Sequence, residues 1–129
     1  LHAYFNVSSV DNVVIKGLAG HCYKNSLDGE LYKLAGDLKI KGEFDSAFVN
    51  HTGGVEIADP VFNRVISVEK SCSNTTVVWN PAKDLKEMSE GQYKKFVCVE
   101  PSNQGASFVH LNPGEKHQIS MKIQVNKLK

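Results

Sequence analysis

The sequence has almost no net charge and no long apolar segment. Its 129 residues include 15 basic and 14 acidic side chains, which gives a net charge of +1, and Arg64 is the single arginine. Nucleic-acid binding usually requires a basic excess that neutralises phosphates, so this balance argues against a nucleic-acid partner. No apolar run approaches the roughly 18 residues that cross a bilayer, so we expect no membrane partner either.

Cysteine is also scarce. Cys22, Cys72 and Cys98 form no Cys-x-x-Cys pair, and three is an odd number for a disulfide-stapled secreted domain. The first residues do not have the pattern of a secretory signal. We therefore predict a cytoplasmic location and interpret the glycosylation sequons that begin at residues 6, 50 and 74 as chance matches.

The sequence does contain a clear period of two. Apolar and polar positions alternate over residues 116–125, which predicts a strand with one buried face and places His117 at the edge of the core. Shorter β-branched or aromatic runs occur at residues 13–15, 38–41, 65–68, 75–79 and 107–110. Several short strands at such spacing predict one all-β domain over residues 1–129, a sandwich or a barrel.

One short helix is expected between these strands. Asn80 is a suitable N-cap, and Pro81 suits the first helical position. Leu85 and Met88 are three residues apart and would share one helical face. The pattern predicts a helix over residues 81–88 that covers one end of the sheet.

Residues 96–101 hold the first candidate for chemistry. Four apolar residues in succession predict a strand that is buried on both faces and that ends at Pro101, which cannot donate to a sheet ladder. Glu100 at the end of such a strand would be partly desolvated, which raises the pKa of a carboxyl group and makes it a candidate general base. The alternative interpretation is a surface glutamate at a strand end.

Two further residues are weaker candidates. His2 stands near an aromatic pair, and histidine is the side chain that most often donates a proton at neutral pH; the alternative is a structural or terminal histidine. Asp45 follows a predicted strand and could accept hydrogen bonds from sugar hydroxyls, or could be an ordinary turn residue. No second Cys/His pair or HExxH motif accompanies His21-Cys22, so we expect no metal site.

Five blocks of sequence, in order, resemble a known family. The blocks are Leu-His-Ala-Tyr-Phe at 1–5, Gly-Leu-Ala-Gly at 17–20, Trp-Asn-Pro at 79–81, Val-Cys-Val-Glu-Pro at 97–101 and Leu-Asn-Pro-Gly-Glu at 111–115. They resemble the hexose-6-phosphate mutarotases, or glucose-6-phosphate 1-epimerase-like proteins, of the aldose 1-epimerase superfamily. The Trp-Asn-Pro and Val-Cys-Val-Glu-Pro blocks are the most specific.

The resemblance implies a fold and an activity. The fold is a galactose mutarotase-like β-sandwich that is larger than this chain, which resembles its carboxy-terminal half. The activity is the interconversion of α and β anomers of a hexose 6-phosphate without a cofactor. By position in the blocks, His2 would be the general acid toward the ring oxygen, Glu100 the general base toward the anomeric hydroxyl, and Asp45 a substrate-binding residue.

The sequence departs from the family in three respects. Ser46 follows Asp45 where the family has arginine, and Ser102 follows Glu100-Pro101 where the family has glycine. The family's phosphate-binding arginine and a second active-site histidine belong to the amino-terminal half, so we expect this chain alone to carry an incomplete site. A non-catalytic carbohydrate-binding or regulatory protein on the same scaffold is therefore the alternative. Half a sandwich leaves strand edges and an apolar face open, so we expect the chain to associate with an amino-terminal half or a second copy.

Overall fold

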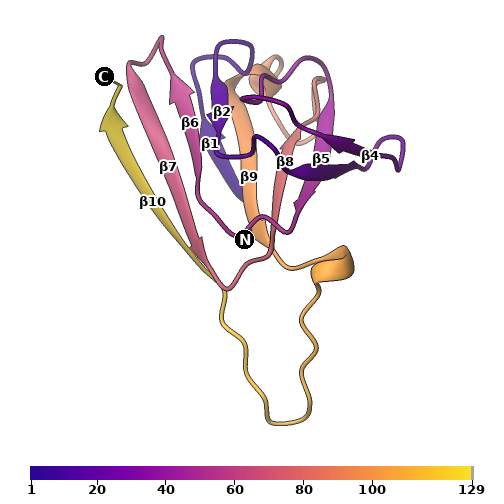
Figure 1. Cartoon of the computed structure of the whole chain (residues 1–129). Coiled ribbons are helices and arrows are strands. Elements are labelled where there is room, and N and C mark those ends of the chain that lie inside the picture. Colours follow the sequence, from indigo (N-terminus) through magenta and orange to yellow (C-terminus); the bar gives the residue numbers. More distant parts are fainter. Residues whose placement is uncertain (129) are drawn as a thin grey trace.

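The computed structural model describes residues 1–128, which form two antiparallel β-sheets packed against each other (Figure 1). The six-stranded sheet consists, in spatial order, of β1 (Ala3–Asn6), β9 (Phe96–Ser102), β8 (Thr75–Asn80), β5 (Phe44–Val49), β3 (Cys22–Asn25) and β4 (Leu31–Lys33). The four-stranded sheet consists of β10 (Ser120–Lys127), β7 (Arg64–Ser71), β6 (Val55–Asp59) and β2 (Val14–Lys16). The all-β sandwich expected from the sequence is confirmed.

The hydrophobic core lies between the two sheets. Val97 and Val99 of β9 and Val78 of β8 project into it from the larger sheet, and Ile57 and Ile66 project into it from the smaller one. Side chains alternate across a strand, so the residues between these core positions face away from the core. Burial of each Val or Ile side chain stabilises the fold by about 1.5–3 kcal/mol.

Polar contacts fasten the end of β1 to the smaller sheet. The backbone amide and the hydroxyl of Ser8 both donate to the Asp59 carboxylate, at 2.7 and 2.6 Å. The Arg64 guanidinium donates to the backbone carbonyl of Asn6. Because His2 immediately precedes β1, these contacts help to hold that residue against β9.

The predicted helix over residues 81–88 does not form. Asn80 is buried within β8, and its Oδ1 accepts a hydrogen bond from the Ala82 amide at 2.9 Å. Its Nδ2 donates to the carbonyls of Tyr93 and Phe96 at 2.8 Å. Ala82 has φ +53°, in the left-handed region, which interrupts a right-handed helix at its second residue. The short 3₁₀ helices of the described chain lie later, at Gln92–Lys95 and Gly105–Ser107.

The closing strand also differs from its prediction. β10 begins at Ser120, so His117 precedes the strand and is exposed rather than lying at the core edge. Residues 107–110 form no strand, and residues 38–41 contribute only an isolated bridge between Leu38 and Ile15. The alternation over 116–125 signals an apolar face, but within residues 1–128 only part of that face is covered: Met121 packs against the core, whereas Ile123 and Val125 are exposed.

Strand β9 continues one residue beyond Pro101, contrary to the predicted end. Thr76 is paired with Pro101 and Thr75 with Ser102. In an antiparallel strand the N–H and C=O of one residue point to the same neighbour. The Pro101 carbonyl accepts from the Leu1 amino group at 2.8 Å, so its missing N–H faces the β1 side and leaves the ladder with β8 intact.

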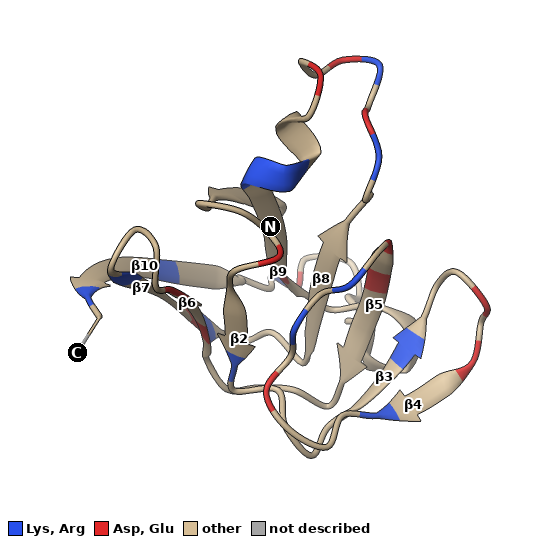
Figure 2. Ribbon diagram, turned by 90° about the horizontal axis from the view of Figure 1, so that it is seen from above, with Lys and Arg blue, Asp and Glu red and all other residues tan. Residues whose placement is uncertain are grey.

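Charges of both signs are spread over the described chain. Figure 2 shows basic and acidic residues interspersed along the segment between β8 and the first 3₁₀ helix, and on the strands below it. Cys22, Cys72 and Cys98 are free thiols, the last of them buried. Among residues 1–128, the helices are too short and too polar to cross a membrane.

Candidate active site

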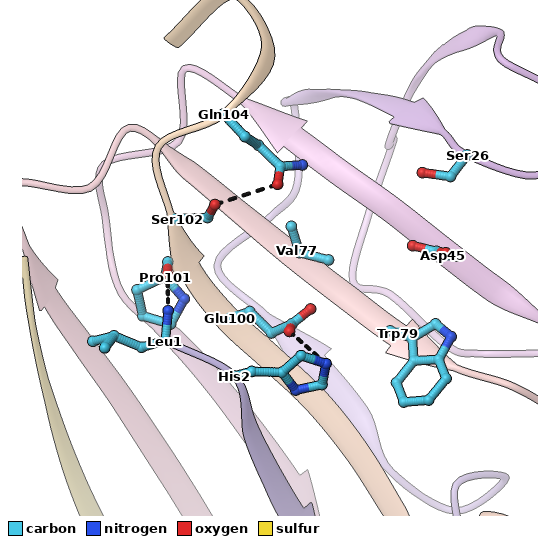
Figure 3. A pocket seen from close by; sticks show the side chains of 10 residues that line it. All are labelled: Leu1, His2, Ser26, Asp45, Val77, Trp79, Glu100, Pro101, Ser102 and Gln104. Carbon is cyan, nitrogen blue, oxygen red and sulfur yellow. Dashed lines mark hydrogen bonds and ion pairs between the residues drawn. The ribbon is translucent and has the colours of Figure 1, made fainter. Parts of the chain in front are cut away.

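A pocket of about 520 Å³ opens on the face of the six-stranded sheet that is turned away from the core. Its volume lies within the range of small-molecule sites. Figure 3 shows the lining residues, which are Leu1, His2, Ser26, Asp45, Val77, Trp79, Glu100, Pro101, Ser102 and Gln104. The structure therefore brings together all three site residues proposed from the sequence.

The period of two explains why these side chains meet. Val78 points into the core, so Val77 and Trp79 on either side of it point into the pocket. Across the sheet, Glu100 is paired with Val77 and Asp45 with Trp79. Three neighbouring strands thus present a carboxylate, an aromatic ring and a second carboxylate on one surface.

His2 and Glu100 form an ion pair at the centre of this surface. Ala3 is paired with Val99, so His2 lies directly across from Glu100 on the neighbouring strand. The distance from His2 Nε2 to Glu100 Oε1 is 2.9 Å. The His2 side chain is 53% exposed and that of Glu100 is 13% exposed. One partner is accessible to a ligand, and the other is largely withdrawn from water.

The environment favours a protonated Glu100 more than water does. Burial raises the pKa of the Glu100 carboxyl group, and the negative charge of Asp45 acts in the same direction. The positive charge of His2 opposes both effects and lowers this pKa. Burial also raises the pKa of Asp45, with a smaller contribution from Glu43. A carboxyl group with a raised pKa beside an imidazole is a suitable proton acceptor and donor.

Aromatic side chains hold the His2 imidazole in place. The ring of His2 stacks on Tyr4 with centroids 4.9 Å apart and an interplanar angle of 16°. Trp79 meets His2 edge to face at 6.0 Å. Phe96 lies behind both, 5.1 Å from Tyr4 and 5.8 Å from Trp79. The imidazole is therefore oriented before any ligand arrives.

Ser46 and Ser102, the two serines that depart from the family pattern, leave the acidic and aromatic side chains of the pocket in place. Ser46 is fully buried on the opposite face of β5 from Asp45, paired with Val78, and its hydroxyl has no hydrogen-bond partner in the described chain. Ser102 is part of β9 and has no positive φ, so the backbone there does not require glycine. Both substitutions fit the strands in which they occur.

A partly buried lysine, Lys70, holds together the outer rim of the pocket. Lys70 Nζ donates to Ser73 Oγ at 3.0 Å and to the Thr75 carbonyl at 3.1 Å, and Ser73 Oγ accepts from the Ser102 amide at 3.0 Å. Burial lowers the pKa of Lys70 to about 8. This network connects β7 to the end of β9, two residues beyond Glu100.

Other histidines have structural surroundings. The buried His51 places Nδ1 2.7 Å from Thr76 Oγ1 and Nε2 2.9 Å from the Gly17 carbonyl, and its ring meets that of His21 at 4.7 Å. Burial lowers the pKa of His51, which favours its neutral form. Within residues 1–128, no three His, Cys, Asp or Glu side chains converge as metal ligands would.

Sequence reasoning missed several lining residues. In the sequence, Trp79 stands out only as part of a motif. It is two residues from Val77 in the predicted strand over 75–79, so the two side chains share a face, and this spacing could have placed Trp79 on the pocket face. Ser26 and Gln104 come from loops and have no periodic signal. The Lys70 network depends on how β7, β8 and β9 are juxtaposed, which sequence spacing does not reveal.

Comparison with known proteins agrees with this geometry. The family model "Aldose 1-epimerase" matches residues 1–124. The chain belongs to the aldose 1-epimerase family. It is 32% identical to a Haemophilus influenzae protein named "Putative glucose-6-phosphate 1-epimerase", over 78% of this chain and 37% of that protein. It is 30% identical to a Cenchrus ciliaris protein of the same name, over 89% of this chain and 36% of that protein.

A solved structure extends the comparison to the fold. The crystal structure of the protein HI1317 superposes with a TM-score of 0.84 at 27% identity, and the match covers 98% of this chain and 45% of that one. The galactose mutarotase-like sandwich implied by the sequence blocks is confirmed. This aldose 1-epimerase family chain thus spans just over a third of the length of the curated relatives that it matches.

Proposed function

We propose that this pocket catalyses the interconversion of α and β anomers of a hexose 6-phosphate. The observation that carries the proposal is the His2–Glu100 pair at 2.9 Å, in a pocket that also contains Asp45. Family membership supports an epimerase chemistry. The names of the Haemophilus and Cenchrus relatives support glucose 6-phosphate as the substrate class.

The pair suits the geometry of the reaction. The anomeric hydroxyl oxygen and the ring oxygen are bonded to the same carbon, so a base and an acid that lie side by side can reach both. Glu100 removes the proton from the C1 hydroxyl, and protonated His2 donates a proton to the ring oxygen as the bond from C1 to that oxygen breaks. The products of this step are the open-chain aldehyde, a protonated Glu100 and a neutral His2.

Ring closure restores both groups. After rotation about the C1–C2 bond, the C5 hydroxyl oxygen attacks the other face of the aldehyde and gives its proton to His2. Glu100 returns its proton to the carbonyl oxygen, which becomes the new anomeric hydroxyl. No proton is gained or lost over the cycle, and each group contributes typically 10²–10⁴-fold in rate. Asp45 would orient the sugar by accepting hydrogen bonds from ring hydroxyls.

The pocket binds the sugar ring rather than the phosphate in this proposal. No lysine or arginine lines it in the described part of the chain. A phosphate that had to enter beside Asp45 and Glu100 would meet two carboxylates, and the one side-chain cation there, protonated His2, is already paired with Glu100. The phosphate group therefore points away from these residues.

Anomer exchange measured by NMR magnetisation transfer tests the proposal. We expect the chain to accelerate exchange of D-glucose 6-phosphate above the buffer rate. Saturable sugar binding without acceleration would support the alternative, a carbohydrate-binding protein on this scaffold. An absence of both binding and exchange would contradict both functions.

We further propose that another layer of protein covers the open side of the sandwich. Phe108 and Leu111 in the segment between β9 and β10 are exposed, as are Ile123 and Val125 of β10. An amino-terminal half of a longer form or a second copy of this chain would bury them. Sedimentation of the chain distinguishes the two, because self-association gives a dimer, and a clean monomer that binds no apolar dye contradicts the need for a cover.

A further inference from the structure

Trp79 has a position in the pocket that the acid–base proposal does not use. It lies on β8, between the strand that carries Asp45 and the strand that carries Glu100. Among the described lining residues, its indole is the one aromatic side chain of the Phe, Tyr or Trp type. Figure 3 shows it at the side of the space that His2, Glu100 and Asp45 surround.

The acid–base and binding residues of this pocket, His2, Asp45 and Glu100, contact only the polar atoms of a ligand. Asp45 and Glu100 are hydrogen-bond acceptors, and His2 exchanges protons. A pyranose ring, in contrast, has polar hydroxyls around its edge and C–H groups on its faces. A site that holds such a ring needs an apolar surface for the face as well as polar groups for the edge. Trp79 and Val77 are apolar lining residues, and each is paired across the sheet with one of the two acidic groups.

We propose that Trp79 is the stacking platform for the sugar, with one C–H face of an aldopyranose lying on the indole while its hydroxyls reach Asp45, Glu100 and His2. The inference rests on the proposed function for the choice of ligand. It adds a residue that determines which ligands bind, because an acyclic or purely anionic compound offers no such face.

The surroundings of the indole support this role. Trp79 is only half-buried, so part of the ring remains open to the pocket. Its packed side is fixed by Phe96 at 5.8 Å and by Tyr4 and His2 at 6.0 Å each. A ring that is already held loses little conformational freedom when a ligand stacks on it. The same contact with His2 links ligand position to the orientation of the imidazole.

Trp79 is the single tryptophan of the chain, so its fluorescence reports directly on the proposed contact. Titration with D-glucose 6-phosphate should change the emission in a saturable way, and titration with D-glucose should do the same, because the proposed contact is with the sugar ring. Inorganic phosphate should leave the emission unchanged. Saturable sugar binding by calorimetry with no change in emission overturns the proposal, as does an equal response to phosphate.

Variants separate stacking from packing. Trp79→Ala should weaken sugar binding measured by calorimetry by about tenfold or more. Trp79→Phe keeps an aromatic face and the packing, so binding should be restored to within a few-fold of the unchanged chain, which also controls for a misfolded alanine variant. Phe62→Ala removes an exposed aromatic ring outside the pocket and should bind sugar normally.

The outcomes for the two proposals are distinct. Trp79-dependent binding with no anomer exchange leaves the platform intact and contradicts the enzyme. Exchange and binding that are unchanged in both Trp79 variants leave the enzyme intact and overturn the platform. No sugar binding by either method overturns both.

Discussion

Strands β9 and β10 both carry several apolar side chains, and they differ in what surrounds these side chains. β9 lies between β1 and β8, with Val97 and Val99 in the core and Phe96 beneath the aromatic cluster. In the described part of the chain, β10 is an edge strand paired only with β7, and its Ile123 and Val125 are 46% and 58% exposed. The catalytic candidate, Glu100, lies on the strand that is covered.

This difference in surroundings shows that β9 can be held rigidly by this chain alone, whereas β10 cannot. A pocket wall must hold His2 and Glu100 in a narrow range of positions. Strand β9 is suited to this because it is paired with β1 on one side and β8 on the other and packs against the core. The apolar face of β10 instead has the composition of an interior surface without the second layer that would make it one. A further layer of protein would therefore change the surroundings of β10 far more than those of the His2–Glu100 pair.

The largest expected effect on stability comes from matched valines on the two strands. Val97→Ala removes two methyl groups from a fully buried site and should lower the free energy of unfolding by about 2 kcal/mol. Val125→Ala changes an exposed side chain and should alter it by less than about 0.5 kcal/mol. Urea unfolding measures both, and equal losses would contradict the contrast between the strands.

The rim network offers a second test, through pH. Lys70 has a folded-state pKa of about 8 because it is buried, whereas an unfolded lysine titrates near 10.4. Between these values the unfolded chain holds a proton that the folded chain has released, so this group favours folding increasingly as pH rises and least below 8. NMR titration of the Lys70 side chain should give a midpoint near 8.

A matched pair of variants isolates this effect. The pH-dependent gain in unfolding free energy should disappear in Lys70→Met and persist in Lys122→Met, which removes an exposed lysine from the adjacent strand. A Lys70 midpoint above 10 would show that the ammonium is not desolvated and would remove the basis of the prediction.

The acid–base pair predicts a smaller, directional effect. Burial raises the pKa of Glu100 and the charge of His2 lowers it. His2→Asn should therefore move the carboxyl titration of Glu100 to higher pH, as followed by carbon NMR. The stability that Glu100 contributes is present below the ordinary glutamate pKa and is lost as pH rises through its raised value. A shift to lower pH in the variant would contradict the ion pair.

The smallest effect is expected at the open edge. Replacement of both Ile123 and Val125 by threonine keeps β-branched residues in the strand but reduces the exposed apolar surface. Binding of an apolar dye and any self-association should fall, while the unfolding midpoint should remain nearly unchanged. If the midpoint drops as it does for Val97→Ala, β10 is already covered in solution.

These two strands also show how far sequence reasoning extends. Glu100 could be located because four successive apolar residues identify a buried strand, although that strand continues one residue beyond the end that Pro101 predicted. His2 and Asp45 were placed by the family resemblance, and antiparallel register then explains why they meet Glu100. The helix over 81–88 failed because the Asn80 side chain bonds to Ala82, Tyr93 and Phe96, contacts that a local capping pattern cannot anticipate.

The rest depends on long-range juxtaposition. Alternation over residues 116–125 indicated an apolar face correctly but carried no information on whether anything covers it. Lys70 resembles any surface lysine in the sequence, and only the approach of the turn after β7 to the end of β9 makes it a partly buried donor. Trp79 acquires its place beside Asp45 from the pairing of β5 with β8.

The most direct test of the central claim is the rate of glucose 6-phosphate anomer exchange in Glu100→Gln, beside the unchanged chain and Glu69→Gln. Glu69 is an exposed carboxylate on β7, outside the pocket, so its variant controls for loss of charge. The account predicts that the unchanged chain and Glu69→Gln accelerate exchange alike, and that Glu100→Gln loses about 10²–10⁴-fold while it still binds the sugar. A Glu100→Gln variant as active as the unchanged chain would contradict it.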